Sequence, residues 1–338
     1  MRNIFKKFTE DRPVMPRRTL IALLLGCLAM VIIVVTVILV LCHQQEPQYD
    51  GRTLSEWLAQ NGNAHRARSS AGGSDPQEAI EAVRHIGTNA LPFLVKWMSY
   101  ETPAWRRQLA AALLRLTPNS RRNASVLSLL GAKREESRWR ALSAFVILGP
   151  EASPAVPDLE RMMKNNKAID PSIVATEALG YIGKDGLPAL IAALSDPSQT
   201  NRWRIIGVIG SIRNLDSNDR RAVVVLIKYL NDSDALLATT AARSLGSLAL
   251  QPDLVVPALT KVFEDPKSRL RIVSALSLGK FGEQARPAVP ALLEALSDPD
   301  RVVRAVALNT LKDIAPDIWQ QAQEDMDGTN TAPKMQRH

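Results

Sequence analysis

Histidines, which serve as metal ligands and as general acids and bases, are few and scattered in this chain of 338 residues. The four are His43, His65, His85 and His338. Only His85 falls in a predicted repeat helix, and Thr88 and Asn89, at the third and fourth positions after it, are not usual partners for a histidine-bound transition metal. The chain also lacks a glycine-rich phosphate loop, a G-x-S-x-G elbow and an H-E-x-x-H motif. We therefore expect no catalytic residues, no metal and no cofactor.

Aspartate and arginine recur together at one fixed separation. The pairs are Asp196/Arg202, Asp265/Arg271 and Asp298/Arg304, and in each pair a proline follows the aspartate. Arg106 and Arg138 hold the same place relative to a predicted helix end, but without the Asp-Pro turn. A carboxylate and a guanidinium can satisfy each other's hydrogen bonds at a partly buried seam. Their repetition indicates a structural role for these residues, not catalysis.

Tryptophan stands beside arginine in three places, and both residue types are enriched at binding hot spots. The candidate partner-binding residues in these clusters are Trp105, Trp139, Arg140, Trp203 and Arg204. One interpretation is that each tryptophan fills the seam between helices, and the other is that the clusters bind an acidic partner. We expect no nucleic acid, because the net charge of +8 includes +4 from residues 1–19 and the rest is spread thinly.

The elements that must position these residues repeat along the chain. Predicted helices end at apolar residues spaced 30 to 36 apart, and a small or β-branched residue stands four positions before each end. We call these apolar residues the unit ends: Ile86, Leu116, Leu148, Ile182, Ile212, Leu248, Phe281 and Ile314. Small side chains four residues apart share a helix face and let neighbouring helices approach closely. This period predicts an all-α solenoid of about eight helix pairs over residues 76–319.

The Asp-Pro turn and the helix ends resemble those of HEAT repeats, specifically the short variety of phycobilisome lyases. The residues that carry the resemblance are Asp298/Arg304, Asp265/Arg271 and the runs 178–183 and 278–282. The resemblance implies a ladder of aspartate–arginine pairs from one repeat to the next. The alternative is that each aspartate caps its own helix. HEAT-like hydroxylases bind iron through His-Glu pairs, and this sequence contains no His-Glu dipeptide.

The N-terminal part predicts a membrane anchor. Residues 1–19 form a basic tail, and the run from Leu20 to Leu41 contains no charged residue and is long enough to cross a bilayer. Both cysteines, Cys27 and Cys42, lie in or beside this run, so no disulfide is possible after it. We expect a retained transmembrane helix over 20–42, with a cleaved signal peptide as the alternative. The positive flank places residues 1–19 in the cytoplasm and the repeats outside it, in the periplasm of a bacterium.

Two segments flank the repeats. Residues 43–75 are predicted to be a linker with a short helix that starts at Leu54, because Thr53 and Glu56 have capping-box spacing. Trp57 lies on the apolar face of that helix, where it caps the first repeat or, alternatively, binds a partner. Residues 320–338 show no periodicity and are predicted to be a disordered tail.

These observations favour a membrane-anchored scaffold that binds an unidentified protein partner. Two alternatives remain. One is an enzyme of the bilin-lyase or metal-dependent type, and the other is a passive spacer with a binding tail. Because the Asp-Arg joints are shared between units, function is expected on the surface between them.

Overall fold

The structure is a computed structural model of the chain. It describes residues 30, 45–64, 76–99, 108, 112, 136–164, 169–196, 198–216, 219–321 and 323. The chain divides between Glu46 and Pro47, and all elements below belong to the C-terminal part. The predicted span at 20–42 lies outside the described residues except for Met30, and so do Trp105 and Arg106. Of the predicted tail at 320–338, only 320, 321 and 323 are described, and these three are helical, since a short helix covers 316–321. No helix within the described ranges combines the length and apolarity needed to cross a bilayer.

The described part of the chain is helical apart from one short hairpin. In this hairpin β1 (Gln48–Tyr49) pairs with β2 (Arg52–Thr53) in antiparallel register. The helices are α3 (Leu54–Ala64), α4 (Pro76–Ile86), α5 (Leu91–Met98), a helix over 136–148, α8 (Val156–Lys164), α9 (Ile169–Ile182), α10 (Leu187–Leu194), α11 (Arg202–Ile209), α12 (Arg220–Tyr229), α13 (Ala235–Leu248), α14 (Pro252–Glu264), α15 (Arg271–Gly279), α16 (Val289–Glu294) and α17 (Arg301–Ile314). Short 3₁₀ turns are η1 (Gly87–Ala90), η2 (Gly149–Ala155), η3 (Gly183–Asp185), η4 (Gly282–Ala288) and η5 (Ala295–Ser297).

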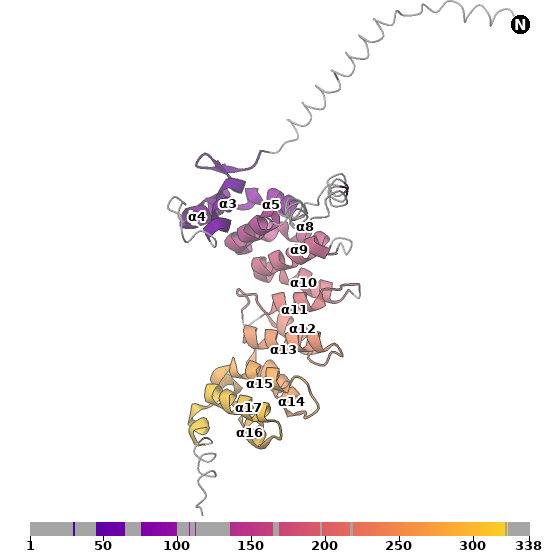
Figure 1. The fold of residues 1–338 in the computed structure, drawn as a ribbon, viewed down its shortest axis with the longest axis vertical. Coiled ribbons are helices and arrows are strands. Elements are labelled where there is room, and N and C mark those ends of the chain that lie inside the picture. The colour runs from indigo at the N-terminus through magenta and orange to yellow at the C-terminus, as the bar shows by residue number, and fades with distance from the viewer. Residues whose placement is uncertain are drawn as a thin grey trace, which may run out of the picture. The chain divides into compact units, whose positions relative to one another are not determined.

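The helices from 136 onward stack in two layers and follow one another in chain order (Figure 1). The first layer consists of the helix over 136–148 with α9, α11, α13, α15 and α17, and the second consists of α8, α10, α12, α14 and α16. From α8 to α17 each helix contacts the next helix of its own layer, and the two layers also contact each other. The predicted solenoid of helix pairs is therefore confirmed over these residues. The total of eight pairs stays a prediction, because one unit lies mostly outside the described residues.

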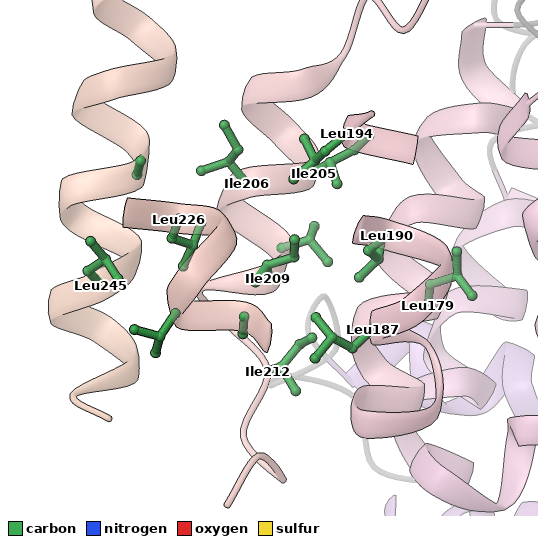
Figure 2. Packing of buried hydrophobic residues seen from close by; sticks show 14 of the residues in the cluster. Leu179, Leu187, Leu190, Leu194, Ile205, Ile206, Ile209, Ile212, Leu226 and Leu245 are labelled. Atoms are coloured by element: carbon green, nitrogen blue, oxygen red, sulfur yellow. The ribbon is translucent and has the colours of Figure 1, made fainter. Parts of the chain in front are cut away.

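Apolar side chains from both layers meet in one continuous core. Figure 2 shows Ile205, Ile206 and Ile209 of α11 between leucines of α10 and α12, and all three isoleucines are fully or almost fully buried. Their i, i+1, i+4 spacing places them on the inward face of α11. Burial of such a side chain stabilises the fold by about 1.5–3 kcal/mol. Each unit thus contributes its own part of a core that no unit can close alone.

A glycine ends several first-layer helices and turns the chain toward the second layer. Gly149, Gly183 and Gly282 directly follow unit ends and have φ angles of 52°, 84° and 53°. In this left-handed region a β-carbon is costly, so glycine is the usual residue there. A 3₁₀ turn then leads into a second-layer helix, and proline occupies the first turn of α10 and α16.

Neighbouring first-layer helices approach each other through glycines two positions before the unit ends. A β-carbon added to Gly180 would lie 2.3 Å from the Val208 side chain, and one on Gly210 would lie 2.4 Å from Ser244. At Gly246 the added carbon would come within 2.8 Å of the Ser277 backbone. The facing residues are the small or β-branched residues that stand four positions before the next unit end. The predicted close approach is therefore present, and glycine supplies the other half of the contact.

Buried hydroxyl groups add hydrogen bonds to the same seams. Ser244 Oγ donates to the Ile206 carbonyl at 3.0 Å, and Ser277 Oγ donates to the Ala242 carbonyl at 2.8 Å. Thr310 repeats the contact one unit later. Each hydroxyl satisfies a helix carbonyl in the preceding unit without breaking that helix.

One rung of the expected aspartate–arginine ladder connects the last two units. Arg271 donates from Nη2 to Asp298 Oδ2 at 2.6 Å, and the two side chains are 15% and 10% exposed. Arg304 donates instead to the carbonyl of Asp298 at 2.7 Å, and Arg202 reaches the carbonyl of Asp196 at 3.4 Å. The arginines therefore make two kinds of contact. One is an ion pair with the aspartate of the next unit, and the other is a hydrogen bond to a carbonyl in the turn before the arginine's own helix.

The alternative in which each of these aspartates caps its own helix is wrong, because each one closes the turn before the helix instead. Asp196 Oδ1 accepts from Ser198 N, and Asp298 Oδ1 accepts from Asp300 N, so each aspartate closes its own turn. The residue that caps α17 is Asp300, which accepts from Val302 N. Asp265 closes a turn in the same way, and the arginine position of the unit before it is occupied by Ala238.

The capping helix at the start of the repeats forms as predicted. Glu56 Oε2 accepts from Thr53 N at 2.7 Å, and Glu56 N donates to Thr53 Oγ1 at 3.4 Å. The hydrogen bond from the Thr53 backbone N–H to the carboxylate is the main reason that the pKa of Glu56 lies below its usual value. The alternative in which Trp57 binds a partner is wrong, because Trp57 is buried. It is only 4% exposed, and its Nε1 donates to the Tyr49 carbonyl.

We predict opposite effects for two glycines of the α11 segment. Gly210→Ala should lower the free energy of unfolding by about 1–3 kcal/mol, because its β-carbon overlaps Ser244. Gly207→Ala is the matched control, since its β-carbon would meet Thr240 at an ordinary 3.7 Å and alanine favours a helix by about 0.5–1 kcal/mol. Urea denaturation followed by circular dichroism measures both. Equal effects of the two substitutions would contradict the close approach.

We predict that the Arg271–Asp298 rung stabilises the C-terminal units. Asp298→Ala should cost about 2–3 kcal/mol, because it removes a charge-assisted hydrogen bond at a mostly buried position. Asp317→Ala is the control, because it breaks an equally inter-unit pair with Arg286 whose side chains are 59% and 51% exposed. Its effect should be much smaller, since exposed pairs are screened. Similar losses for the two variants would exclude a special role for the rung.

The same pair predicts a pH dependence. The hydrogen bond from Arg271 holds the pKa of Asp298 below its usual value, so the carboxylate contributes stability above its unfolded pKa. That contribution is lost as pH falls through the lower folded pKa. Between about pH 5 and pH 2 the wild type should lose more stability than Asp298→Asn, as measured by denaturation midpoints. Parallel pH profiles of the two proteins would argue against the pair.

Candidate partner-binding surface

Large apolar side chains are exposed mainly on the first layer. Within the described part of 47–321, eight of ten such residues belong to first-layer helices. These eight are Trp139, Val146, Tyr181, Trp203, Leu236, Ile272, Leu276 and Val302. The other two are Val224 on α12 and Leu293 on α16. Exposed apolar side chains gathered on one face mark interaction surfaces more often than scattered ones do.

The residues of the predicted tryptophan–arginine clusters differ in how much of their surface is exposed to solvent. Trp139 is 65% exposed and Trp203 is 39% exposed, so neither is enclosed in the seam between helices. Arg138, beside the first of them, is buried instead. Arg140 is partly exposed and pairs with Glu136 one helical turn earlier. The tryptophans thus face outward while the arginine before Trp139 faces inward.

Arg204 joins two helices at this surface. Its guanidinium lies 4.8 Å from the centre of the Trp203 ring and donates to Glu177 of α9 at 3.0 Å. Arg204 Nε is buried and meets no hydrogen-bond acceptor among the described residues. Stacking on the indole fixes the plane of the guanidinium. Arg204 is therefore held in place with hydrogen-bonding capacity left over.

A cavity of about 430 Å³ lies between the two tryptophan-bearing helices. Its wall includes Trp139 from the helix over 136–148, Tyr181 from α9 and Arg204 from α11, and Leu142, Ile173 and Val174 line it too. The structure thereby brings Trp139 and Arg204 to one cavity, although a whole unit separates them in the sequence. Burial raises the pKa of the Tyr181 phenol, and the nearby Glu177 carboxylate raises it further. The phenol accordingly stays protonated as a hydrogen-bond donor.

Two further cavities continue along the first layer. One of about 730 Å³ shares Glu177 and Tyr181 with the first cavity and reaches Arg213. The next, of about 570 Å³, shares Ser211 and Arg213 with the second and reaches Arg243 on α13. Since neighbouring cavities share lining residues, we treat them together as the first-layer groove. Glycines at 180, 207 and 210 line the groove and project no side chain into it.

Sequence reasoning missed much of this groove. Tyr181, Glu177, Arg213 and Arg243 lie outside the Trp-Arg clusters that drew attention. The sequence did contain a sign of two of these residues. Glu177 and Arg243 both stand five positions before a unit end, and the residue at this position differs between units, since others carry Ser143 or Leu276. Variation at a position that recurs in every unit indicates a surface with its own chemistry.

The described residues also show where the one histidine among them lies. His85 of α4 packs against the ring of Tyr49, with the ring centres 4.6 Å apart. No cluster of histidine, cysteine, aspartate or glutamate within the described ranges could hold a metal ion. His43, His65 and His338 lie outside these ranges.

Comparison with known proteins identifies the repeat type in the C-terminal part. Residues 223–312, from α12 into α17, match the family model for HEAT repeats. The predicted resemblance is confirmed for this stretch, whereas the likeness to the phycobilisome-lyase variety stays a prediction. No curated protein matches the chain.

Solved structures similar to the chain include two that align over most of it. An engineered protein determined by a structural genomics consortium is 18% identical, with 81% of this chain and 72% of that chain covered and a TM-score of 0.38. Human deoxyhypusine hydroxylase in complex with glycerol is 18% identical, with 77% of this chain and 96% of that chain covered and a TM-score of 0.32.

Proposed function

We propose that the protein is a membrane-anchored scaffold that binds another protein through the exposed face of its first layer. The observation that carries the proposal is the concentration of exposed apolar side chains on that layer. HEAT repeats, matched at 223–312, have a fold compatible with such a role. Stacked repeats offer an extended surface because each unit adds one helix face to it.

The anchor and its orientation belong to this proposal. They are supported by the sequence, in which an uncharged apolar run over 20–41 follows six lysines and arginines and precedes a flank with few. The repeats would then lie on the extracytoplasmic side and meet partners in or near the same membrane.

A non-enzymatic role completes the proposal. It is supported by the scattered histidines and by the absence of the iron-binding His-Glu pair from the sequence. An enzyme of the lyase or metal-dependent type has no specific observation in its favour. The passive spacer with a binding tail is less favoured, because a spacer needs no apolar surface on one layer in particular.

We predict that protein contacts form on the first layer and not on the second. Leu276 on α15 and Val224 on α12 are both 52% exposed, so they make a matched pair. A photo-cross-linking amino acid is placed at either position of the full-length protein in its native membrane. The position on α15 should yield a discrete cross-linked protein after irradiation, whereas the position on α12 should yield at least fivefold less. Equal yields, or none at either position, would remove the basis of the scaffold proposal.

We predict that the repeats are exposed on the outside of the cytoplasmic membrane. In a background of Cys27→Ser and Cys42→Ser, a new thiol at Ser297→Cys should react with a membrane-impermeant maleimide in intact cells freed of any outer membrane. Ser297 is exposed in η5, so access to the thiol is not limited by burial. The matched variant Asn3→Cys should react only after permeabilisation. The reverse pattern would show that the orientation is wrong.

A further inference from the structure

The charges of the first-layer groove are unbalanced. Its charged lining residues are Arg138, Arg204, Arg213 and Arg243 against a single carboxylate, Glu177. Arg204 already pairs with that carboxylate. Arg213 and Arg243 are both exposed, and neither has a hydrogen-bond or ion-pair partner among the described residues. The groove therefore carries net positive charge that its own walls do not neutralise.

The polarity of the groove changes along its length. The end near Trp139 is apolar, since Leu142, Ile173 and Val174 line it beside the tryptophan. The end near Arg243 is polar, because Thr240 and Ser247 line it together with the two free guanidinium groups. A ligand that fits both ends must offer an apolar side chain at one end and acidic groups at the other.

The dimensions suit an extended chain. The groove crosses four successive first-layer helices, which at about 8–10 Å per helix spans about 27 Å. An extended peptide advances about 3.3 Å per residue, so about eight residues would fill the groove. Gly207 gives a peptide backbone close access to the helix surface, because a β-carbon there would meet only Thr240, at 3.7 Å.

We propose that the first-layer groove binds an extended acidic segment of a partner protein. An apolar side chain of the segment packs against Trp139 and Tyr181, and its carboxylates bind Arg213 and Arg243 as charge-assisted hydrogen-bond acceptors. Glu177 near the middle accepts a hydrogen bond from the segment's backbone. This inference rests on the proposed scaffold function and names the chemistry of its partner.

A peptide fits this groove better than a nucleic acid does. Phosphate binding is driven by cations along the whole contact, whereas the two unpaired guanidinium groups of this groove, Arg213 and Arg243, lie toward one end of it. The apolar wall beside Trp139 also offers aliphatic groups that contribute little to phosphate contacts. A peptide uses the apolar wall, the single carboxylate and the basic end together.

The test uses full-length protein in detergent micelles and fluorescence anisotropy. The probe is a labelled eight-residue peptide with one leucine near its N-terminus followed by four glutamates. The acidic peptide should bind at least tenfold more tightly than the same peptide with glutamines. Arg213→Glu combined with Arg243→Glu should weaken binding at least tenfold. The control Lys228→Glu with Lys261→Glu makes the same change in net charge on exposed second-layer positions, and it should change binding less than twofold.

Several results would overturn the assignment. They are absence of binding by the acidic peptide, equal binding of the glutamine peptide, and equal losses in the groove and control variants. Tighter binding of a twelve-nucleotide single-stranded DNA would assign the groove to nucleic acid instead. Unchanged circular dichroism spectra and thermal midpoints exclude misfolding of either double variant as the cause.

One competing occupant belongs to the chain itself. The run Glu324-Asp325-Met326-Asp327 is acidic, so truncation after residue 323 is compared with the full chain. The truncation should leave peptide affinity unchanged, and a tenfold gain would assign the groove to the chain's own tail. Failure of the groove is distinguishable from failure of the scaffold, because Leu276, the cross-linking position, does not line the groove. Cross-links at that position without peptide binding would keep the scaffold and reject this site.

Discussion

The close approach of successive first-layer helices is the constraint on which the other features depend. At three successive seams a glycine of one helix faces a small or β-branched residue of the next, as Gly210 faces Ser244 and Gly246 faces Ser277. The buried hydroxyl then bonds a carbonyl of the preceding helix. A larger side chain at either place would push the helices apart and open the core beneath them. The ladder rung between Arg271 and Asp298 acts at the far end of the same helices, where it ties one turn to the next.

The same glycines that permit close packing also shape the surface. Gly180 and Gly210 face neighbouring helices closely, and both also line the first-layer groove. The groove is thus a consequence of how the repeats join. Its chemistry comes from positions that the joint does not constrain, such as the one occupied by Glu177 in one unit and Arg243 in another. Structural constraint and binding specificity are therefore carried by different positions of each unit.

The sequence predicted the features that are local or periodic. Spacing within one helix can be read directly from a sequence. It was enough to predict the unit ends, the small residues before them and the capping box of Thr53 and Glu56. Two features could not be predicted from the sequence. The burial of Trp57 depends on packing against α4, and the meeting of Trp139 with Arg204 depends on the stacking of units more than sixty residues apart. Only the assembled layers determine which outward residues converge.

An anchor and a modest groove complement each other physically. Exposed arginines lose part of their interaction energy to solvent and salt, so a basic open groove binds a free peptide weakly. A scaffold held at the membrane by residues 20–42, as proposed, would meet a partner in the same membrane at an effective concentration far above that in free solution. Weak, salt-sensitive contacts would then suffice for occupancy, and they would release the partner quickly once it left the membrane. The composition of the groove, with free guanidinium groups beside one apolar wall, suits reversible assembly at a surface better than permanent association.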